Sequence, residues 1–571
     1  MPVLSGVDKL QHPAQYMRQI VSINETNARG RDLSVGAFDY VIVGAGSSGC
    51  VLANRLSADG RHKVLLLEAG PKDNYLWIHI PIGYGKTMFH KAYNWGFYTD
   101  PEANMHDRRI YWPRGRGLGG SSSINGLIFI RGQSDDYDHW AQLGNTGWDW
   151  NSVLPYFMKS EHNSRGASET HGGDGPLWSS DIKEKSELME AIIRGAGELG
   201  VPRTDDFNSG NQEGAGYFQL FTHNGWRISS AVAYLKPARA RKNLHIETDA
   251  HATGIILEGR KAVGVRYRQN GVMHEVRAAR EVILSAGSLQ SPQLLQLSGI
   301  GPAELLRQHG IEVVHDLPGV GQNLQDHLQF RLMYRISKPI TTNDDLRTLA
   351  GQARIGLKWL MTGAGPLGIG INQGGLFTRV LPGSRTPDIQ FHFGTLSAEQ
   401  AGGKPHDWSG CTFSVCQLRP ESRGSVEIRS ADPMLPPSMR PNYLAAETDR
   451  ICAVEAIKYA RRLAETDALK PYIESEYKPG AAVHSDSDIL EFARESGATI
   501  FHPTGTCKMG SDPMAVTDAS LRVHGIACLR VVDCSIMPTL VSGNTHAPAV
   551  MIAEKASDMI LAGARGESKA A

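Results

Sequence analysis

Residues 38–49 read FDYVIVGAGSSG, an apolar strand followed at once by a glycine-rich turn that opens a helix. The unbroken apolar run Tyr40–Val43 is typical of a strand buried in a parallel sheet. In the turn, Gly44 permits the sharp reversal, Gly46 lets the backbone approach a pyrophosphate, and Gly49 allows close packing of the helix on the strand. The helix N-terminus offers free N–H groups to such a pyrophosphate. The stretch therefore predicts a dinucleotide-binding unit of the Rossmann type.

A second apolar strand supports this interpretation. Residues 64–67 read VLLL and are followed directly by Glu68. A carboxylate at the end of this strand can accept hydrogen bonds from a ribose. The order of elements is thus that of a dinucleotide-binding motif: strand, turn, helix, second strand and acidic residue. The turn itself leaves NAD and FAD equally open, because both nucleotides use it.

The composition narrows the classes of partner and of compartment. The chain has 571 residues with 59 Lys plus Arg and 59 Asp plus Glu, so no basic excess indicates a nucleic-acid partner. Its seven scattered Cys include no C-x-x-C pair, which favours a reducing compartment over a disulfide scaffold or a metal site. We find neither a signal-peptide pattern nor a run of about 18 apolar residues. We expect a cytoplasmic protein without a transmembrane segment, and its oligomeric state stays open.

The N-terminal extension, residues 1–36, precedes the first strong signal. Apolar residues between Tyr16 and Val21 recur at helical spacing after Pro13, which predicts a short amphipathic helix. Such a helix packs on its own domain, or it contacts a membrane surface or another subunit. Peripheral membrane association therefore stays open.

The later segments indicate a mixed fold. Strand-like segments lie at 245–285, 388–393 and 411–418. The stretch from about 150 to 215 is polar and is interpreted as loop-rich, whereas helical patterns cover 449–467 and about 547–562. Buried strands combined with helices predict the α/β class, α+β overall.

Five further motifs follow in order along the chain. They are PRGRGLGGSSSING at 113–126, SAGSLQSPQLL at 285–295 with GIGP at 299–302, LPGVGQNLQDH at 317–327, HPTGTCKMG at 502–510 and VDCSIMP at 532–538. In this order they resemble the signatures of the glucose–methanol–choline (GMC) oxidoreductases, in particular the bacterial choline-dehydrogenase-like branch. The resemblance runs from about Phe38 to Ile560, which is nearly the whole chain.

The resemblance implies a Rossmann-like FAD-binding domain interleaved with a substrate domain built on an antiparallel sheet. We assign residues 37–150, 220–330 and 500–565 to the FAD-binding domain. Residues 151–219 and 331–499 are assigned to the substrate-binding domain. Some members of the family bind the flavin covalently through a His before the Asn of the first signature. This chain has Ile124 there, so we expect non-covalent FAD.

The resemblance also implies which residues hold FAD. In the first signature, consecutive small residues expose backbone N–H groups that can cradle electron-rich edges. Ala252 is expected to contact adenine through its backbone, and Asp533 to lie at the flavin. The complete expected set is Gly44, Gly46, Ser47, Ser48, Gly49, Glu68, Ala69, Arg116, Leu118, Gly120, Ser121, Ser122, Asn125, Gly126, Leu127, Ile128, Ala252, Phe501, Asp533, Asn544 and Thr545.

Two histidines are predicted to carry the chemistry. Hydride transfer from an alcohol needs a base for the hydroxyl proton and a donor for the developing alkoxide. His502 lies in the motif where the family keeps the base, and the resemblance makes His546 its partner. The two roles are interchangeable at this point, and a shift of two residues would give the place of His546 to Asn544. His139, His327 and His392 are interpreted as structural.

The substrate is less constrained. Choline would require a carboxylate or an aromatic cage for its ammonium group. Asn372-Gln373 stands where choline-handling relatives carry an acidic residue. The apolar segments 77–84 and 365–371 are expected to cover the site, which favours a neutral primary alcohol, aliphatic or aromatic. The electron acceptor is oxygen, a quinone or another carrier; a lyase, a light-driven decarboxylase and a structural flavin are the rival functions.

Overall fold

The computed structural model describes residues 38–400 and 402–565, so the expected helix near Tyr16 lies outside the described residues. The first sheet contains the predicted dinucleotide unit. Its parallel strands run in the order β10 (Leu244–Glu247), β2 (Val64–Leu67), β1 (Phe38–Val43), β13 (Val272–Leu284) and β24 (Leu529–Val531). The bounds of β1 and β2 agree with the two apolar runs of the sequence, and the Rossmann-type prediction is confirmed.

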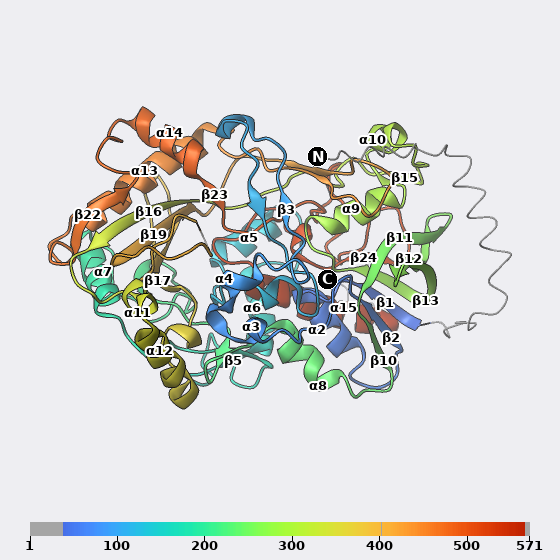
Figure 1. Ribbon diagram of the computed structural model, residues 1–571. Coiled ribbons are helices and arrows are strands. Elements are labelled where there is room, and N and C mark those ends of the chain that lie inside the picture. The colour runs from blue at the N-terminus through green and yellow to red at the C-terminus, as the bar shows by residue number, and fades with distance from the viewer. Residues whose placement is uncertain (1–37, 401, 566–571) are drawn as a thin grey trace, which may run out of the picture. The chain divides into compact units, whose positions relative to one another are not determined.

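The long strand β13 also joins this sheet to an antiparallel meander. It pairs with β12 (Lys261–Gln269), which in turn pairs with β11 (Ala250–Glu258). Helices α2 (Ser47–Leu56) and α15 (His546–Ala564) pack against each other beside the parallel strands (Figure 1). Both helices begin at the turns where the sequence places candidate site residues.

A second sheet is built from later segments. Its antiparallel strands run in the order β22 (Ile473–Lys478), β16 (Leu328–Ile336), β19 (Gly410–Gln417), β18 (Ile389–Gly394), β17 (Asn372–Thr378) and β7 (Gly214–Tyr217). Helices α7 (Glu187–Glu198) and α13 (Glu447–Ala464) pack on this sheet. The two sheets lie on opposite sides of the picture (Figure 1), and the division into two domains at the stated boundaries stays a prediction.

Side chains of the second sheet alternate between two environments, as the pleat of a strand requires. On β16, Phe330 and Leu332 belong to a buried apolar cluster that also includes residues of α7 and α13. Gln329 and Arg331, which alternate with them, line a cavity on the opposite face. One face of this sheet is therefore core, and the other is available for chemistry.

Much of the stretch 150–215 lies outside helices and strands, as expected, but it is not loop throughout. Two helices lie in this stretch, α6 (Trp150–Ser160) and α7. Asp149 and Ser186 cap them by accepting the backbone N–H of the third residue that follows. In α7 the apolar residues recur at helical spacing and are buried, so tertiary packing stabilises a segment whose average composition is polar.

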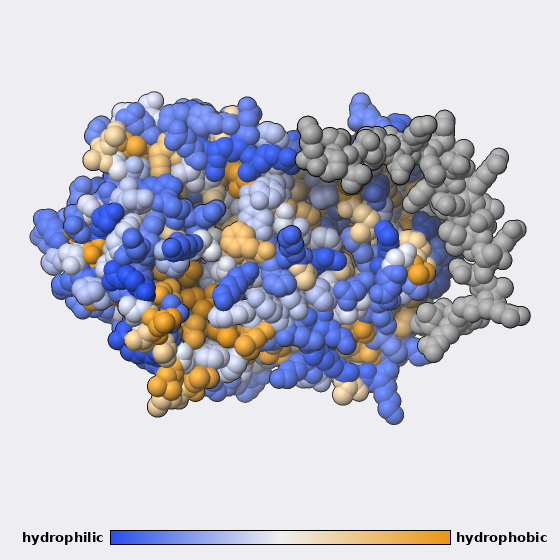
Figure 2. Space-filling view, in the orientation of Figure 1, coloured by the Kyte–Doolittle hydropathy of each residue, from blue (hydrophilic) through white to orange (hydrophobic). Residues whose placement is uncertain are grey.

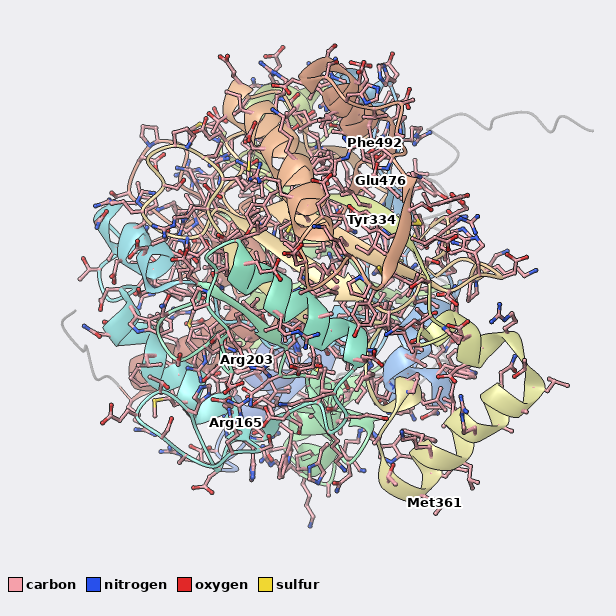
Figure 3. The ribbon with its side chains drawn as sticks, turned by 90° about the vertical axis from the view of Figure 1, so that its left-hand side faces the viewer. Arg165, Arg203, Tyr334, Met361, Glu476 and Phe492 are labelled. Atoms are coloured by element: carbon pink, nitrogen blue, oxygen red, sulfur yellow. The ribbon has the colours of Figure 1, made fainter. Side chains whose placement is uncertain are left out.

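Helix α12 (Leu349–Thr362) forms part of the outer wall of the cavity. Its inner residues Gln352 and Ile355 line the cavity. Its outer face carries the exposed side chains Leu349, Leu357, Leu360 and Met361. Figure 2 shows apolar side chains gathered over this helix, and Figure 3 shows Met361 at its outer end. No helix within residues 38–400 and 402–565 is long and apolar enough to cross a membrane.

The other helices of six or more residues among the described residues complete the fold. They are α5 (Ser134–Gln142), α9 (Gln290–Leu297), α10 (Ala303–Gln308), α11 (Thr342–Arg347) and α14 (Asp486–Ser496).

Candidate active site

A single cavity of about 760 Å³ extends from the glycine-rich turn to the second sheet. Most residues expected to hold FAD line it, namely Gly44, Gly46, Ser47, Ser48, Glu68, Ala69, Gly120, Ser121, Ser122, Asn125, Gly126, Leu127, Ile128, Ala252, Phe501, Asp533, Asn544 and Thr545. His502 and His546 also line it. The structure thus brings together residues that are up to about 500 positions apart in the sequence.

Three of the expected cofactor residues do not line the cavity. A Cβ on Gly49 would lie 1.8 Å from the Gly44 carbonyl oxygen, so this glycine serves the packing of helix on strand. The Arg116 guanidinium lies over the ring of Trp95, 5.2 Å from its centre. Leu118 is buried in the apolar core. In this structure the three residues support the wall, and their contact with the cofactor stays a prediction.

The first glycine of the turn has the conformation that the sequence requires. Gly44 has φ +98°, and a Cβ there would lie 2.5 Å from the Ser285 carbonyl oxygen. At Gly46 the nearest neighbour of such a Cβ is the same oxygen at 3.9 Å, so this backbone is open to the cavity. The turn is therefore shaped for close approach of a ligand.

The Glu68 carboxylate is bonded mainly to backbone. Its Oε2 accepts the N–H of Ala45 at 2.8 Å, and its Oε1 accepts the N–H groups of Gly70 and Gly117, both at 2.8 Å. Burial raises the pKa of Glu68, while these N–H groups favour its ionised form. Because a carboxylate offers about four acceptor positions, one remains for a ribose hydroxyl. Glu68 therefore holds three loops together in addition to its expected role.

The wall near the second motif fits a flavin dinucleotide. Gly126 and Gly287 line the cavity, and a Cβ on either residue would meet no atom within 4 Å. Their backbone is therefore open to the cavity. The Ser288 hydroxyl is buried without a hydrogen-bond partner among the described residues. Asp533 accepts the N–H of Gly287 at 2.9 Å and the hydroxyl of Ser291 at 2.6 Å, which joins two of the sequence motifs. Open backbone and unpaired donors are what an electron-rich cofactor edge needs.

Two residues of the same wall have a strained backbone. Phe501 and Leu127 both have φ +71°, a left-handed conformation that costs a non-glycine residue about 1–3 kcal/mol. The carbonyl oxygen of Phe501 accepts a hydrogen bond from Arg114 at 2.8 Å, which holds the strained residue in place. This conformation places His502 directly after the turn, at the wall of the cavity.

Hydrogen bonds fix which nitrogen of His502 is free. The Leu418 carbonyl can only accept, so Nε2 of His327, 2.9 Å away, carries its proton. Burial lowers the pKa of His327 to about 4, so its Nδ1 is unprotonated and accepts from His502 Nδ1 at 2.9 Å. His502 therefore keeps its lone pair on Nε2. Burial, and then the neighbouring His327, hold the pKa of His502 well below 6.5.

Asn544, and not His546, lies beside His502. The Asn544 amide nitrogen is 3.3 Å from His502 Nε2, and its Oδ1 accepts from Gln390 at 3.2 Å. Nε2 of His546 lies 3.1 Å from the hydroxyl of Ser230, and its ring packs edge-on against Phe221. The physical reason is that α15 begins at His546, so this ring is fixed by the first turn of the helix. In this structure the contact with His502 is thus made by Asn544, the alternative that a shift of two residues gives, and the catalytic pair itself stays a prediction.

Sequence reasoning missed two residues that line the cavity and a third, His327, that contacts His502 from behind the wall. His327 orients His502, and both ring nitrogens of the buried His392 lack partners among the described residues. Arg331 lines the cavity as well. The alternating polar pattern His327, Gln329, Arg331 across an otherwise apolar strand was the available signal, because alternate residues share one face.

Comparisons with known proteins identify the family. The family model of the N-terminal part of GMC oxidoreductases matches residues 38–329, and the model of the C-terminal part matches 420–553. The mitochondrial choline dehydrogenase of Mus musculus is 44% identical over 538 residues, which cover 92% of this chain and 90% of that protein. The alcohol dehydrogenase (acceptor) of Pseudomonas putida is 43% identical over 528 residues, with coverage of 92% and 96%.

Solved structures share the fold. Pyridoxine 4-oxidase from Mesorbium loti has a TM-score of 0.83 at 32% identity, covering 91% of this chain and 98% of that one. A variant of formate oxidase from Aspergillus oryzae, studied for its FAD modification, has a TM-score of 0.87 at 28% identity, with coverage of 93% and 99%. The matched ranges include the turn, the first signature and the His502 motif. This chain therefore belongs to the GMC oxidoreductase family.

Proposed function

We propose that this protein oxidises a primary alcohol, aliphatic or aromatic, to the aldehyde with FAD as the hydride acceptor. The observation that carries the proposal is the position of His502 in the cavity wall, with its Nδ1 against His327 and its Nε2 beside the Asn544 amide. A lone pair next to an N–H donor is the arrangement that a hydroxyl group needs when its proton leaves. Relatives named as choline and alcohol dehydrogenases support the same reaction class.

Each side chain has a separate task in this proposal. His502 takes the hydroxyl proton on Nε2, because its depressed pKa keeps that nitrogen unprotonated. Asn544 donates a hydrogen bond to the oxygen on which negative charge develops. His327 holds His502 in the required tautomer through the Nδ1 contact. When bound, FAD supplies the site that accepts hydride from the carbinol carbon.

The geometry of the cavity bears on the substrate. The expected covering segments contribute Trp77, Tyr84, Leu367 and Ile371 to its wall. Among the described residues, the carboxylates that line the cavity are Glu68 and Asp533, and both are bonded to backbone at the nucleotide end. A free carboxylate for the ammonium group of choline is therefore lacking in this part of the chain. An alcohol with an apolar body fits this wall better.

The attachment of FAD and the electron acceptor are each proposed from a single kind of evidence. Ile124 stands where a covalent link would need His, which supports non-covalent FAD. A dehydrogenase that passes electrons to a quinone or another carrier is favoured by the named relatives, and an oxidase that uses oxygen is the alternative that the named structures favour. A cytoplasmic location with peripheral membrane contact stays part of the proposal.

The function is tested by mixing the holoenzyme with a panel of alcohols in the absence of oxygen and following the flavin absorbance. Rapid bleaching by one class of primary alcohol is the expected result. Admission of air then distinguishes the two acceptors, because an oxidase recovers its colour quickly. Bound flavin that no alcohol reduces would overturn the proposal.

Substitutions of Asn544 and of His546 are expected to lower kcat by different amounts. Asn544→Ala removes the donor beside His502 and should lower kcat by about 10²- to 10³-fold, the usual effect of losing such a donor. His546→Asn should change kcat less than about threefold, since Nε2 of His546 contacts Ser230 and not His502. Single-turnover reduction of the flavin measures both variants. The reverse ranking would restore His546 as the partner.

A further inference from the structure

Arg331 lies at the end of the cavity formed by the second sheet. It belongs to β16, where it alternates with core residues and so projects onto the cavity face. Its cross-strand neighbour on β19 is Ser414, and Met333 is likewise opposite Thr412. Ser414 and Thr412 line the cavity too. This end of the cavity is therefore one polar sheet face with a single guanidinium in it.

The guanidinium lacks a counter-ion within residues 38–400 and 402–565. No salt bridge, hydrogen bond or stacked ring there involves the Arg331 side chain, and burial lowers its pKa. Glu399 attracts it from a distance, but that exposed carboxylate is bonded to Tyr477 and His406. Arg131 differs, because this buried guanidinium pairs with Glu161.

An unpaired charge removed from water is costly, and proteins normally pair it. Arg227 is buried, whereas Arg331 is half-buried and faces the cavity. Arg227 lacks a carboxylate but donates to the carbonyl oxygens of Ile78, Ser122 and Pro81 and to Asn125. Arg331 has no such set of acceptors in the part of the chain that the structure describes. The unused donors of this guanidinium therefore point to a negatively charged group that arrives with a ligand.

The surroundings favour an anion. Burial raises the pKa of Tyr84 to about 12, so its hydroxyl stays neutral and adds no negative charge near Arg331. Gln329 and Asn372 contribute neutral amides to the same wall. The two lining carboxylates are at the nucleotide end and are already bonded.

We propose that Arg331 binds a carboxylate at the far end of the substrate, so that the natural substrates are hydroxy acids oxidised at their primary alcohol. This proposal rests on the proposed function and replaces the expectation of a neutral alcohol. It also gives a physical reason against choline, because the guanidinium repels an ammonium group. Arg331 is then the residue that sets substrate specificity.

The test compares a straight-chain series of ω-hydroxycarboxylates with the matched ω-hydroxyamides. The wild-type holoenzyme should show a kcat/KM for the best carboxylate about 10- to 100-fold above that of its amide, as expected for a hydrogen bond to a charged group. Arg331→Gln should abolish this preference, mainly through KM, and Arg331→Lys should retain part of it. Equal kcat/KM for acid and amide in the wild type would overturn the inference.

A matched control is available on the same strand. Arg335 lies over the rings of Trp408 and Tyr477 and does not line the cavity, so Arg335→Gln should keep the full preference for the acid. Calorimetric binding of unreactive straight-chain carboxylates, which have no hydroxyl, separates the two proposals. Binding that is lost only in Arg331→Gln supports the anion site even if no alcohol reduces the flavin. Binding that is unchanged in Arg331→Gln excludes the site.

Discussion

Replacement of His502 by Ala is expected to leave FAD bound and to lower alcohol turnover by about 10²- to 10⁴-fold, the contribution of a positioned base. The Nε2 lone pair is lost, while the expected nucleotide contacts at the glycine-rich turn are far from this side chain in the fold. The rate of anaerobic flavin reduction measures the loss, and the ratio of flavin to protein absorbance measures retention of FAD. Turnover within about threefold of the wild type would falsify the assignment.

The pH dependence of kcat/KM tests the proposed role of His502 independently. Burial, and the His327, His392 and Arg114 neighbours, lower the pKa of His502 well below 6.5. As the pH falls through 6.5, an exposed histidine would become protonated, whereas His502 stays available as a base. The wild-type kcat/KM should therefore stay constant through this region and decline only at lower pH. A decline centred near 6.5 contradicts the buried, neutral base.

Replacement of Glu68 by Ala is expected to abolish FAD retention. The substitution leaves the N–H groups of Ala45, Gly70 and Gly117 without their acceptor, and each unsatisfied buried donor costs about 1–3 kcal/mol. It also removes the acceptor that is expected to bind the ribose. Flavin content after gel filtration, and the Tm with and without added FAD, measure the effect.

Two control variants distinguish loss of the Glu68 hydrogen bonds from general damage to the sheet. Glu68→Gln keeps the shape and one acceptor oxygen, so an intermediate flavin content is expected. Glu247→Ala changes a carboxylate on the neighbouring strand, opposite Leu67, that does not line the cavity, and it should keep FAD fully. Full flavin content and an unchanged Tm in Glu68→Ala would exclude both roles of this carboxylate.

The sequence by itself determined the local units. The strands at Phe38–Val43 and Val64–Leu67 agree with the apolar runs that predicted them, because a buried parallel strand needs only a short continuous apolar segment. The left-handed Gly44 and the packed Gly49 follow from the motif for the same local reason. A motif of adjacent residues likewise predicted that His502 is a site residue. The helix α7 was harder to predict from the sequence, since a polar segment becomes helical only when its apolar residues pack against the rest of the fold.

Only the tertiary structure decided the composition of the site. Asn544 and His546 are two residues apart, and their order along the chain does not tell which one faces His502. The start of α15 turns Nε2 of His546 toward Ser230 and leaves Asn544 beside His502. The unpaired state of Arg331 is also a tertiary property, because charge pairing is a relation between segments that are distant in the sequence. Local pattern thus fixes elements and motifs, whereas contacts between remote elements decide which side chains act together.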